Sequence, residues 1–127
     1  MIAVDTSALM AVILAEARAG ACMKVLESET EILISAGTMA EAMIVAARRN
    51  VGDEMAKLID GLGFNVVPVT AASARRVAQA YFRWGKGVHP GGLNFGDCFA
   101  YAVAKEHSCP LLFIGDDFSK TDLQRAV

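Results

Sequence analysis

The residues of this sequence that could do chemistry are five acids that follow a common pattern. Asp5 ends the short apolar run MIAVD, and Asp116 and Asp117 follow the run PLLFI. Glu41 and Asp97 each stand near the start of a helix-forming stretch. A ligand set made of carboxylates, with no histidine or cysteine in it, favours Mg²⁺ or Mn²⁺ over zinc. A divalent cation held by acids suits phosphoryl chemistry, because it lowers the pKa of a bound water and stabilises charge in the transition state.

Each of these acids also has a purely structural explanation. Asp5 could cap the helix that follows it, and Glu41 could close a capping box that begins at Thr38. Asn94 is a good N-cap for a helix that has Asp97 in its first turn, where the helix dipole favours a negative charge. The Gly-Asp-Asp sequence is ordinary turn chemistry. Taken singly, the structural role is favoured for every one of them.

The strands and helices predicted around the acids indicate where the acids lie in the fold. Short apolar runs alternate with helix-forming stretches, which favours a parallel sheet covered by helices on both faces. The expected strands are residues 1–5, 31–35, 64–69 and 110–114, and the expected helices are 8–16, 18–27, 38–50, 53–62, 71–84 and 94–107. Pro68 places the third strand at an edge of the sheet or ends it early. All five acids then fall on the rim at the carboxyl ends of the strands, where sites form in such sheets.

Convergence of several acids on one crevice changes the balance between the two explanations. Arg48 and Lys120 are the basic residues closest to the acids in the sequence. The mutual repulsion of four carboxylates must therefore be offset by a cation, or some of them must be protonated. A bound Mg²⁺ or Mn²⁺ is the simplest solution.

Composition limits the class of protein. The 127 residues make one domain, 1–127, long enough to bury a core. Hydrophobic residues make up 54% and charged residues 20%, which indicates a compact chain that hides apolar surface against a partner. The net charge is −2, which argues against a protein that relies on non-specific nucleic-acid affinity but leaves room for a nuclease with local basic residues.

Cysteine usage and the N-terminal residues predict a cytoplasmic location. Cys22, Cys98 and Cys109 are odd in number and widely spaced, so neither a disulfide framework nor a zinc site is indicated. The apolar N-terminus lacks a basic segment and contains Asp5, so we interpret it as a buried strand and helix rather than a signal peptide. No apolar run reaches membrane-spanning length, and no membrane partner is expected.

Four stretches together resemble a known family. They are DTSAL from Asp5, the helix containing Glu41, LNFGDCFAYAVAKE around Asp97, and PLLFIGDDFSKTDL at the C-terminus. The chain resembles the PIN-domain family, and within it the VapC-type toxins of bacterial toxin–antitoxin pairs. The resemblance covers essentially the whole length, and the two C-terminal motifs are its most specific part.

The resemblance implies a fold and an activity. The fold would be three-layer α/β/α, with helices flanking a parallel sheet of four to five strands; the family is described with five. The activity would be that of a Mg²⁺-dependent endoribonuclease, with Mn²⁺ as an alternative metal. Such an enzyme cleaves RNA phosphodiester bonds with a metal-activated water.

The same resemblance implies roles for the acids. Asp5 and Asp97 would be the principal metal ligands. Glu41 would complete the cluster, either as a ligand or as the group that orients the attacking water. The fourth acid would be Asp117 or Asp116, with Asp117 favoured because it belongs to the Asp-Phe pair.

Two further polar residues would support these acids. Ser7 would hydrogen bond to a ligand carboxylate and orient it. Asn94 would act as a helix cap or as a similar support. A basic series on the helix of residues 71–84 and just after it is either an RNA-binding strip or a solvated helix face; its members are Arg75, Arg76, Arg83 and Lys86.

The expected partners follow from the resemblance and from composition. The substrate would be RNA, with transfer RNA or ribosomal RNA as the targets seen in the family. A cognate antitoxin would hold the enzyme inactive, by placing an arginine or lysine in the acidic crevice. The apolar excess fits a homodimer.

Three other functions fit the sequence less well. A receiver-type phospho-acceptor domain needs paired acids after the first strand and a lysine after the last. Here Asp5 is followed by Thr6 and Ser7, and Gly115 and Asp116 stand where the lysine is required. Haloacid dehalogenase chemistry fails because Ser7 occupies the position of its second aspartate. A PIN-type module that binds RNA or protein without cleavage is the remaining alternative, and five intact acids count against it.

Overall fold

The computed structural model describes all residues from 1 to 127, with four strands and six helices. Strands and helices alternate through most of the chain. The elements are β1 (Ile2–Val4), α1 (Thr6–Ile13), α2 (Ala19–Ser28), β2 (Ile32–Ser35), α3 (Ala36–Arg48), α4 (Gly52–Leu62), β3 (Asn65–Val67), α5 (Ala71–Trp84), α6 (Phe95–Glu106) and β4 (Leu111–Leu112).

The four strands form one parallel sheet in the order β3-β2-β1-β4. β3 is an edge strand and ends just before Pro68, which confirms the expectation for that proline. The fifth strand of the family description does not form. In its place, Arg125 makes a single parallel bridge to Leu111. Leu123, Ala126 and Val127 of the C-terminal segment nevertheless pack against the two cores.

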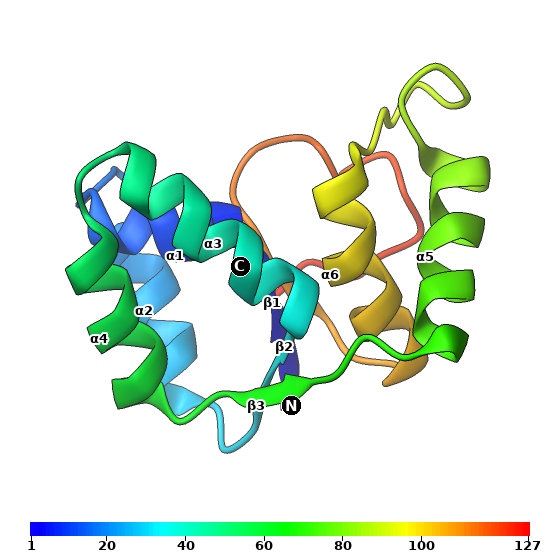
Figure 1. Cartoon of the computed structure of the whole chain (residues 1–127). Helices are drawn as coiled ribbons and strands as arrows, with labels where there is room; N and C mark the ends of the chain where they lie inside the picture. The colour runs from blue at the N-terminus through cyan, green and yellow to red at the C-terminus, as the bar shows by residue number, and fades with distance from the viewer.

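Helices cover both faces of the sheet, so the expected three-layer α/β/α fold is confirmed (Figure 1). Alternate strand residues point to opposite faces. Ala3, Leu33 and Leu111 belong to the core beneath α5 and α6. The neighbouring positions, among them Val4 and Ile34, belong to the core beneath the first four helices. Strands buried on both faces explain why these runs are continuously apolar.

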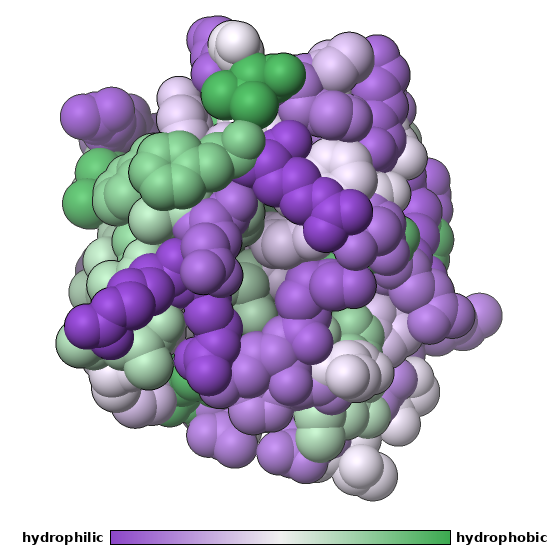
Figure 2. Space-filling model, turned by 90° about the vertical axis from the view of Figure 1, so that its right-hand side faces the viewer, coloured by the Kyte–Doolittle hydropathy of each residue, from purple (hydrophilic) through white to green (hydrophobic).

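The face formed by α5 is mainly hydrophilic, and hydrophobic atoms gather along one edge of it (Figure 2). Phe82 and Phe95 are the most exposed aromatic side chains of the protein, at 72% and 69%. No helix combines the length and apolarity that crossing a bilayer requires.

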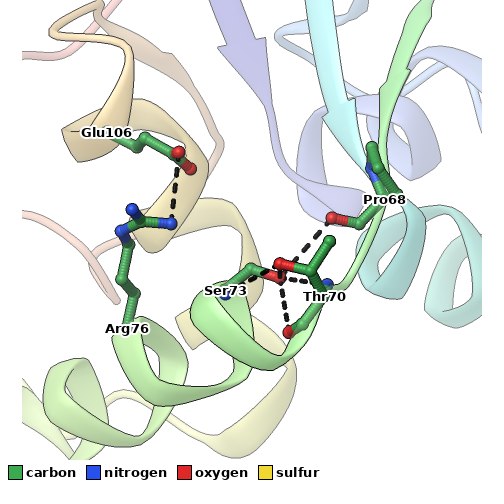
Figure 3. Close-up of polar contacts among 5 residues, drawn as sticks. All are labelled: Pro68, Thr70, Ser73, Arg76 and Glu106. Carbon is green, nitrogen blue, oxygen red and sulfur yellow. Dashed lines mark hydrogen bonds and ion pairs between the residues drawn. The ribbon is translucent and has the colours of Figure 1, made fainter.

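α5 is fixed at its start and against α6 by polar contacts (Figure 3). Thr70 and Ser73 form a capping box, which satisfies backbone N–H groups that the first helical turn leaves free. Arg76 pairs with Glu106 of α6 at 3.2 Å. Part of the basic series is therefore already engaged within the protein: Arg76 by this ion pair, and Arg83 by its stacking on the Trp84 ring at 4.7 Å.

A chain of hydrogen bonds ties α5 and α6 to the C-terminal segment. The indole N–H of Trp84 donates to the Tyr101 hydroxyl at 2.8 Å, and that hydroxyl donates to Asp122 at 2.6 Å. Lys105 pairs with the other oxygen of Asp122 at 3.0 Å. These bonds hold the segment that carries Asp116 and Asp117 against α6.

Candidate active site

Asp5 is buried at the carboxyl end of β1, where it caps α1. Its Oδ2 accepts the backbone N–H of Ser7 at 3.0 Å, so the structural role expected for a cap is present. Its Oδ1 is buried and has no hydrogen-bond partner. Burial raises the pKa of Asp5 to about 6, hydrogen bonds from Ser7 oppose this, and the charge of Glu41 adds to it. Capping therefore uses one oxygen and leaves the other free for a cation or a proton.

Ser7 joins α1 to the end of β4. Its hydroxyl accepts the backbone N–H of Ile114 at 3.0 Å, and its own backbone N–H holds Asp5. Ser7 thus fixes two rim segments that are far apart in sequence. Its role as an orienting group for a ligand carboxylate stays a prediction.

Replacing Ser7 by alanine is expected to lower the free energy of unfolding by about 1 to 2 kcal/mol, because the partly buried N–H of Ile114 loses its acceptor. Urea unfolding of both proteins measures the difference. Ser28→Ala is the matched control, because the Ser28 hydroxyl bonds only to its own helix at an exposed position. Equal stability losses for the two variants would contradict the bridging role of Ser7.

Glu41 projects from α3 toward the start of α1. Its Oε1 accepts the Thr6 hydroxyl at 2.7 Å. The expected capping box of Thr38 and Glu41 is wrong, because Ser35 caps the helix instead. α3 begins at Ala36, so Thr38 lies within the helix rather than at its cap. The Thr38 hydroxyl is buried without a hydrogen-bond partner. Glu41 is therefore free of a capping role and lies at the rim.

Asp97 is buried in the first turn of α6 with its carboxylate at the same rim. Asn94 and Asp97 form a reciprocal capping box: Asn94 Oδ1 accepts the Asp97 N–H at 2.8 Å, and Asp97 Oδ2 accepts the Asn94 N–H at 3.0 Å. Burial raises the pKa of Asp97 to about 7, against the opposing hydrogen bond from Asn94. The charges of Asp5, Asp117 and Glu41 raise it further.

The two candidates for the fourth acid differ in their surroundings. Both Asp116 and Asp117 are exposed in the turn after β4. The charge of Asp117 contributes to the raised pKa of Asp97. Asp116 holds the turn through its backbone carbonyl, which accepts both the N–H and the hydroxyl of Ser119. Proximity to Asp97 thus favours Asp117.

The rim therefore brings four of the predicted acids within electrostatic reach of one another, namely Asp5, Glu41, Asp97 and Asp117. No three acid, histidine or cysteine side chains lie close enough to enclose a metal ion as the side chains stand. The donors nevertheless fit a hard cation: all are carboxylate oxygens, and the buried Oδ1 of Asp5 has no partner.

Sequence reasoning missed two residues at this rim, Thr6 and Gly96. Thr6 binds Glu41 across 35 positions of sequence, and nothing in the local pattern indicates that contact. Gly96 lies directly against the Glu41 carboxylate. A glycine inside a predicted helix, one position before an acid, was the available signal for a close approach.

A groove of about 460 Å³ runs between α3 and α6 beside the acids. Glu41 lies on its wall, and Ile44, Phe95 and Phe99 give it an apolar lining. Arg48 lines it as well, as its one basic residue.

The chain was compared with known families and proteins. The sequence model of the PIN domain matches residues 2–123. Ribonuclease VapC42 of Mycobacterium tuberculosis is 40% identical over 128 residues, covering 97% of each chain. Ribonuclease VapC28 of the same organism is 39% identical, covering 98% of this chain and 96% of its own.

Solved structures share the fold at lower sequence identity. VapC20 of M. tuberculosis, described as a toxin that cleaves the sarcin–ricin loop, superposes with a TM-score of 0.77 at 20% identity, covering 97% of this chain and 96% of its own. A chain of a toxin–antitoxin complex from Klebsiella pneumoniae gives a TM-score of 0.73 at 18% identity, covering 96% and 93%.

Proposed function

The chain belongs to the PIN-domain family, and from this premise we propose that it cuts RNA with the carboxylates gathered at the rim of its sheet. It is an endoribonuclease of the VapC group, as its relatives at about 40% identity over nearly the whole chain support. The observation that carries the assignment of the site is the burial of Asp97 among the other rim acids: burial raises its pKa most, and the charges of Asp5, Asp117 and Glu41 raise it further. The receiver-type alternative has no observation in its favour.

The chemistry of the donors supports a divalent cation, Mg²⁺ or Mn²⁺, at this rim. When bound, such an ion lowers the pKa of a coordinated water and stabilises charge on the phosphoryl oxygens. Asp5, through its free Oδ1, and Asp97 would hold it. Glu41 would either complete the ligand set or accept a proton from the attacking water. Asp117, which is exposed, would add the fourth charge.

The surrounding residues keep these carboxylates in place. The Ser7 N–H fixes Oδ2 of Asp5, the Asn94 N–H fixes Oδ2 of Asp97, and the Thr6 hydroxyl fixes Oε1 of Glu41. Each of the three carboxylates is thus oriented by one hydrogen bond, which reduces the reorganisation needed when a cation binds. Asn94 combines this support with its role as helix cap.

RNA docking would be specific rather than general. The net charge is −2, and two arginines of the basic series are engaged within the protein. We therefore propose cleavage at few sites in a structured RNA, either transfer RNA or ribosomal RNA. VapC20, which shares the fold, is described as a toxin that cleaves the sarcin–ricin loop, and this is in line with a specific target.

An antitoxin is the expected protein partner, in line with the toxin–antitoxin complexes among the structural neighbours. A segment covering the α3–α6 groove would place apolar side chains against Ile44 and Phe95. An arginine or lysine of that segment would lie near Glu41 and offset the clustered negative charge.

We also propose that the protein forms a homodimer and that it is located in the cytoplasm.

The function is tested with purified protein and total cellular RNA. With Mg²⁺ or Mn²⁺ at a concentration on the order of millimolar, discrete new 5′ ends are expected in the RNA. Excess EDTA should abolish them. Sequencing of the ends identifies the RNA. Cleavage that persists in EDTA would contradict the proposed dependence on a divalent metal. The absence of discrete ends with every RNA tested would contradict the nuclease assignment.

A further inference from the structure

The first turn of α6 lies in direct contact with the Glu41 side chain. A Cβ atom added to Gly96 would overlap Glu41 Oε2, and it would lie 2.7 Å from Cδ and 3.1 Å from Oε1 of the same side chain. Real Cβ atoms do not approach neighbours this closely, so residue 96 and the carboxylate compete for one space. Glu41 reaches its position only because residue 96 has no side chain.

Gly96 has no conformational reason to be glycine. Its φ is not positive, unlike those of Gly63, Gly87, Gly92 and Gly115. It lies inside a helix, where glycine is less favourable than alanine. Glycine at position 96 therefore serves to leave room for the Glu41 carboxylate.

A second glycine brings the same two helices together one turn away. A Cβ on Gly37 of α3 would lie 2.7 Å from Cγ of the Phe99 ring on α6. α3 and α6 thus cross closely at two points, Gly37 against Phe99 and Glu41 against Gly96. The second contact places the Glu41 carboxylate one residue from Asp97.

Two contacts act on the two oxygens of Glu41. The Thr6 hydroxyl donates to Oε1, and Oε2 lies against the first turn of α6, at the helix end whose dipole favours a negative charge. An added methyl group at residue 96 would displace the carboxylate from that turn and strain its bond to Thr6.

We propose that Gly96 is a positioning residue, which admits the Glu41 carboxylate to the start of α6 and so sets its distance from Asp97. The proposal rests on the proposed function, because it assigns Glu41 to the metal-binding rim. It predicts that the effect of a side chain at position 96 depends on the presence of Glu41.

A double-mutant cycle tests this dependence. The proteins are wild type, Gly96→Ala, Glu41→Ala and the double variant, and the probes are Mn²⁺ affinity by electron paramagnetic resonance and the Tm of the metal-free protein. Gly96→Ala is expected to weaken Mn²⁺ binding about tenfold when Glu41 is present. In the Glu41→Ala background the same change should alter the affinity by less than about twofold.

The Tm should change by different amounts in the two backgrounds. With Glu41 present, Gly96→Ala displaces the flexible end of the Glu41 side chain and strains its bond to Thr6, so the gain in Tm is smaller or absent. Without Glu41, alanine is the better helix residue and raises the Tm by about 2 °C. Gly61→Ala is the matched control, because a Cβ there meets nothing within 4 Å inside α4, and it should leave Mn²⁺ affinity unchanged.

Equal effects of Gly96→Ala in the two backgrounds, in affinity and in Tm, would overturn the proposal. If Gly96→Ala alone fails to fold, the double variant decides: a folded protein with a higher Tm than Glu41→Ala supports the contact, and an unfolded one overturns it. If wild type binds no Mn²⁺, the metal assignment fails, while the Tm cycle still decides whether Gly96 positions Glu41.

Discussion

Replacing Asp97 by asparagine is expected to slow RNA cleavage by at least about a hundredfold while the fold is retained. The substitution removes the charge that the proposed metal site needs from the acid nearest the other three. The amide oxygen of asparagine can still accept the Asn94 N–H, so the capping box that starts α6 has a replacement acceptor. Loss of cleavage would then reflect the site rather than the helix.

The stability of the same variant separates the two roles of Asp97. Because burial and three neighbouring acids raise the pKa of Asp97, its charged form is unfavourable in the metal-free fold at neutral pH. Asp97→Asn should therefore make the metal-free protein more stable at pH 7.5, by about 1 to 2 kcal/mol. A residue that served only as a cap would show no such gain, because the amide oxygen replaces the carboxylate as acceptor.

Cleavage is followed with a mapped RNA fragment under single-turnover conditions, and stability by urea unfolding in EDTA. Asp53→Asn is the matched control, since Asp53 also lies in a first helical turn but is exposed, and its charge is not among those that raise the pKa of Asp5 or Asp97. Wild-type rates for Asp97→Asn, or an equal loss for both variants, would remove Asp97 from the site.

The layout of the fold could be predicted from the sequence because its signals are local. Apolar runs such as 31–35 become strands buried on both faces, and Asn94 caps its helix as expected. Boundaries shifted where caps were missed: Ser35 caps α3, which begins at Ala36, two residues before the predicted start at 38. The fifth strand is reduced to one bridge at Arg125, while Leu123, Ala126 and Val127 of this segment still pack against the two cores.

The rim position of the acids was also predictable, because parallel strands end on one side and helices then begin there. Contacts between distant segments were not. The Thr6–Glu41 bond and the Glu41–Gly96 contact depend on how closely α3 approaches α1 and α6, which no local pattern specifies. The roles of the site residues stay predictions until the variants are measured.

Acidification should stabilise the metal-free protein, in contrast to most proteins, which lose stability as their carboxylates become protonated. The ordinary pKa of an aspartate is 3.8, whereas burial raises that of Asp5 to about 6 and that of Asp97 to about 7. Between about pH 4 and pH 7 the folded state therefore binds more protons than the unfolded state. The free energy of unfolding must then fall as pH rises through this window and stay low above it.

The expected gain between pH 7.5 and pH 5 is about 2 to 4 kcal/mol, since each pKa unit corresponds to about 1.4 kcal/mol. Urea unfolding in EDTA at both pH values measures it. Asp5→Asn combined with Asp97→Asn should make the stability nearly independent of pH in this range. Loss of stability on acidification in wild type, or the same gain in the double variant, would contradict the crowding of these two acids.

Metal should reverse the trend, because a cation binds the charged carboxylates and competes with protons. At pH 7.5, saturating Mn²⁺ is expected to raise the Tm of wild type, and at pH 5 the rise should be much smaller. The Asp5→Asn and Asp97→Asn double variant should show no rise at either pH. A Tm shift of equal size in wild type and in the double variant would place the bound metal elsewhere on the protein. The pH at which the shift is half-maximal then reports the apparent pKa of the rim, which the two aspartates place between about 6 and 7.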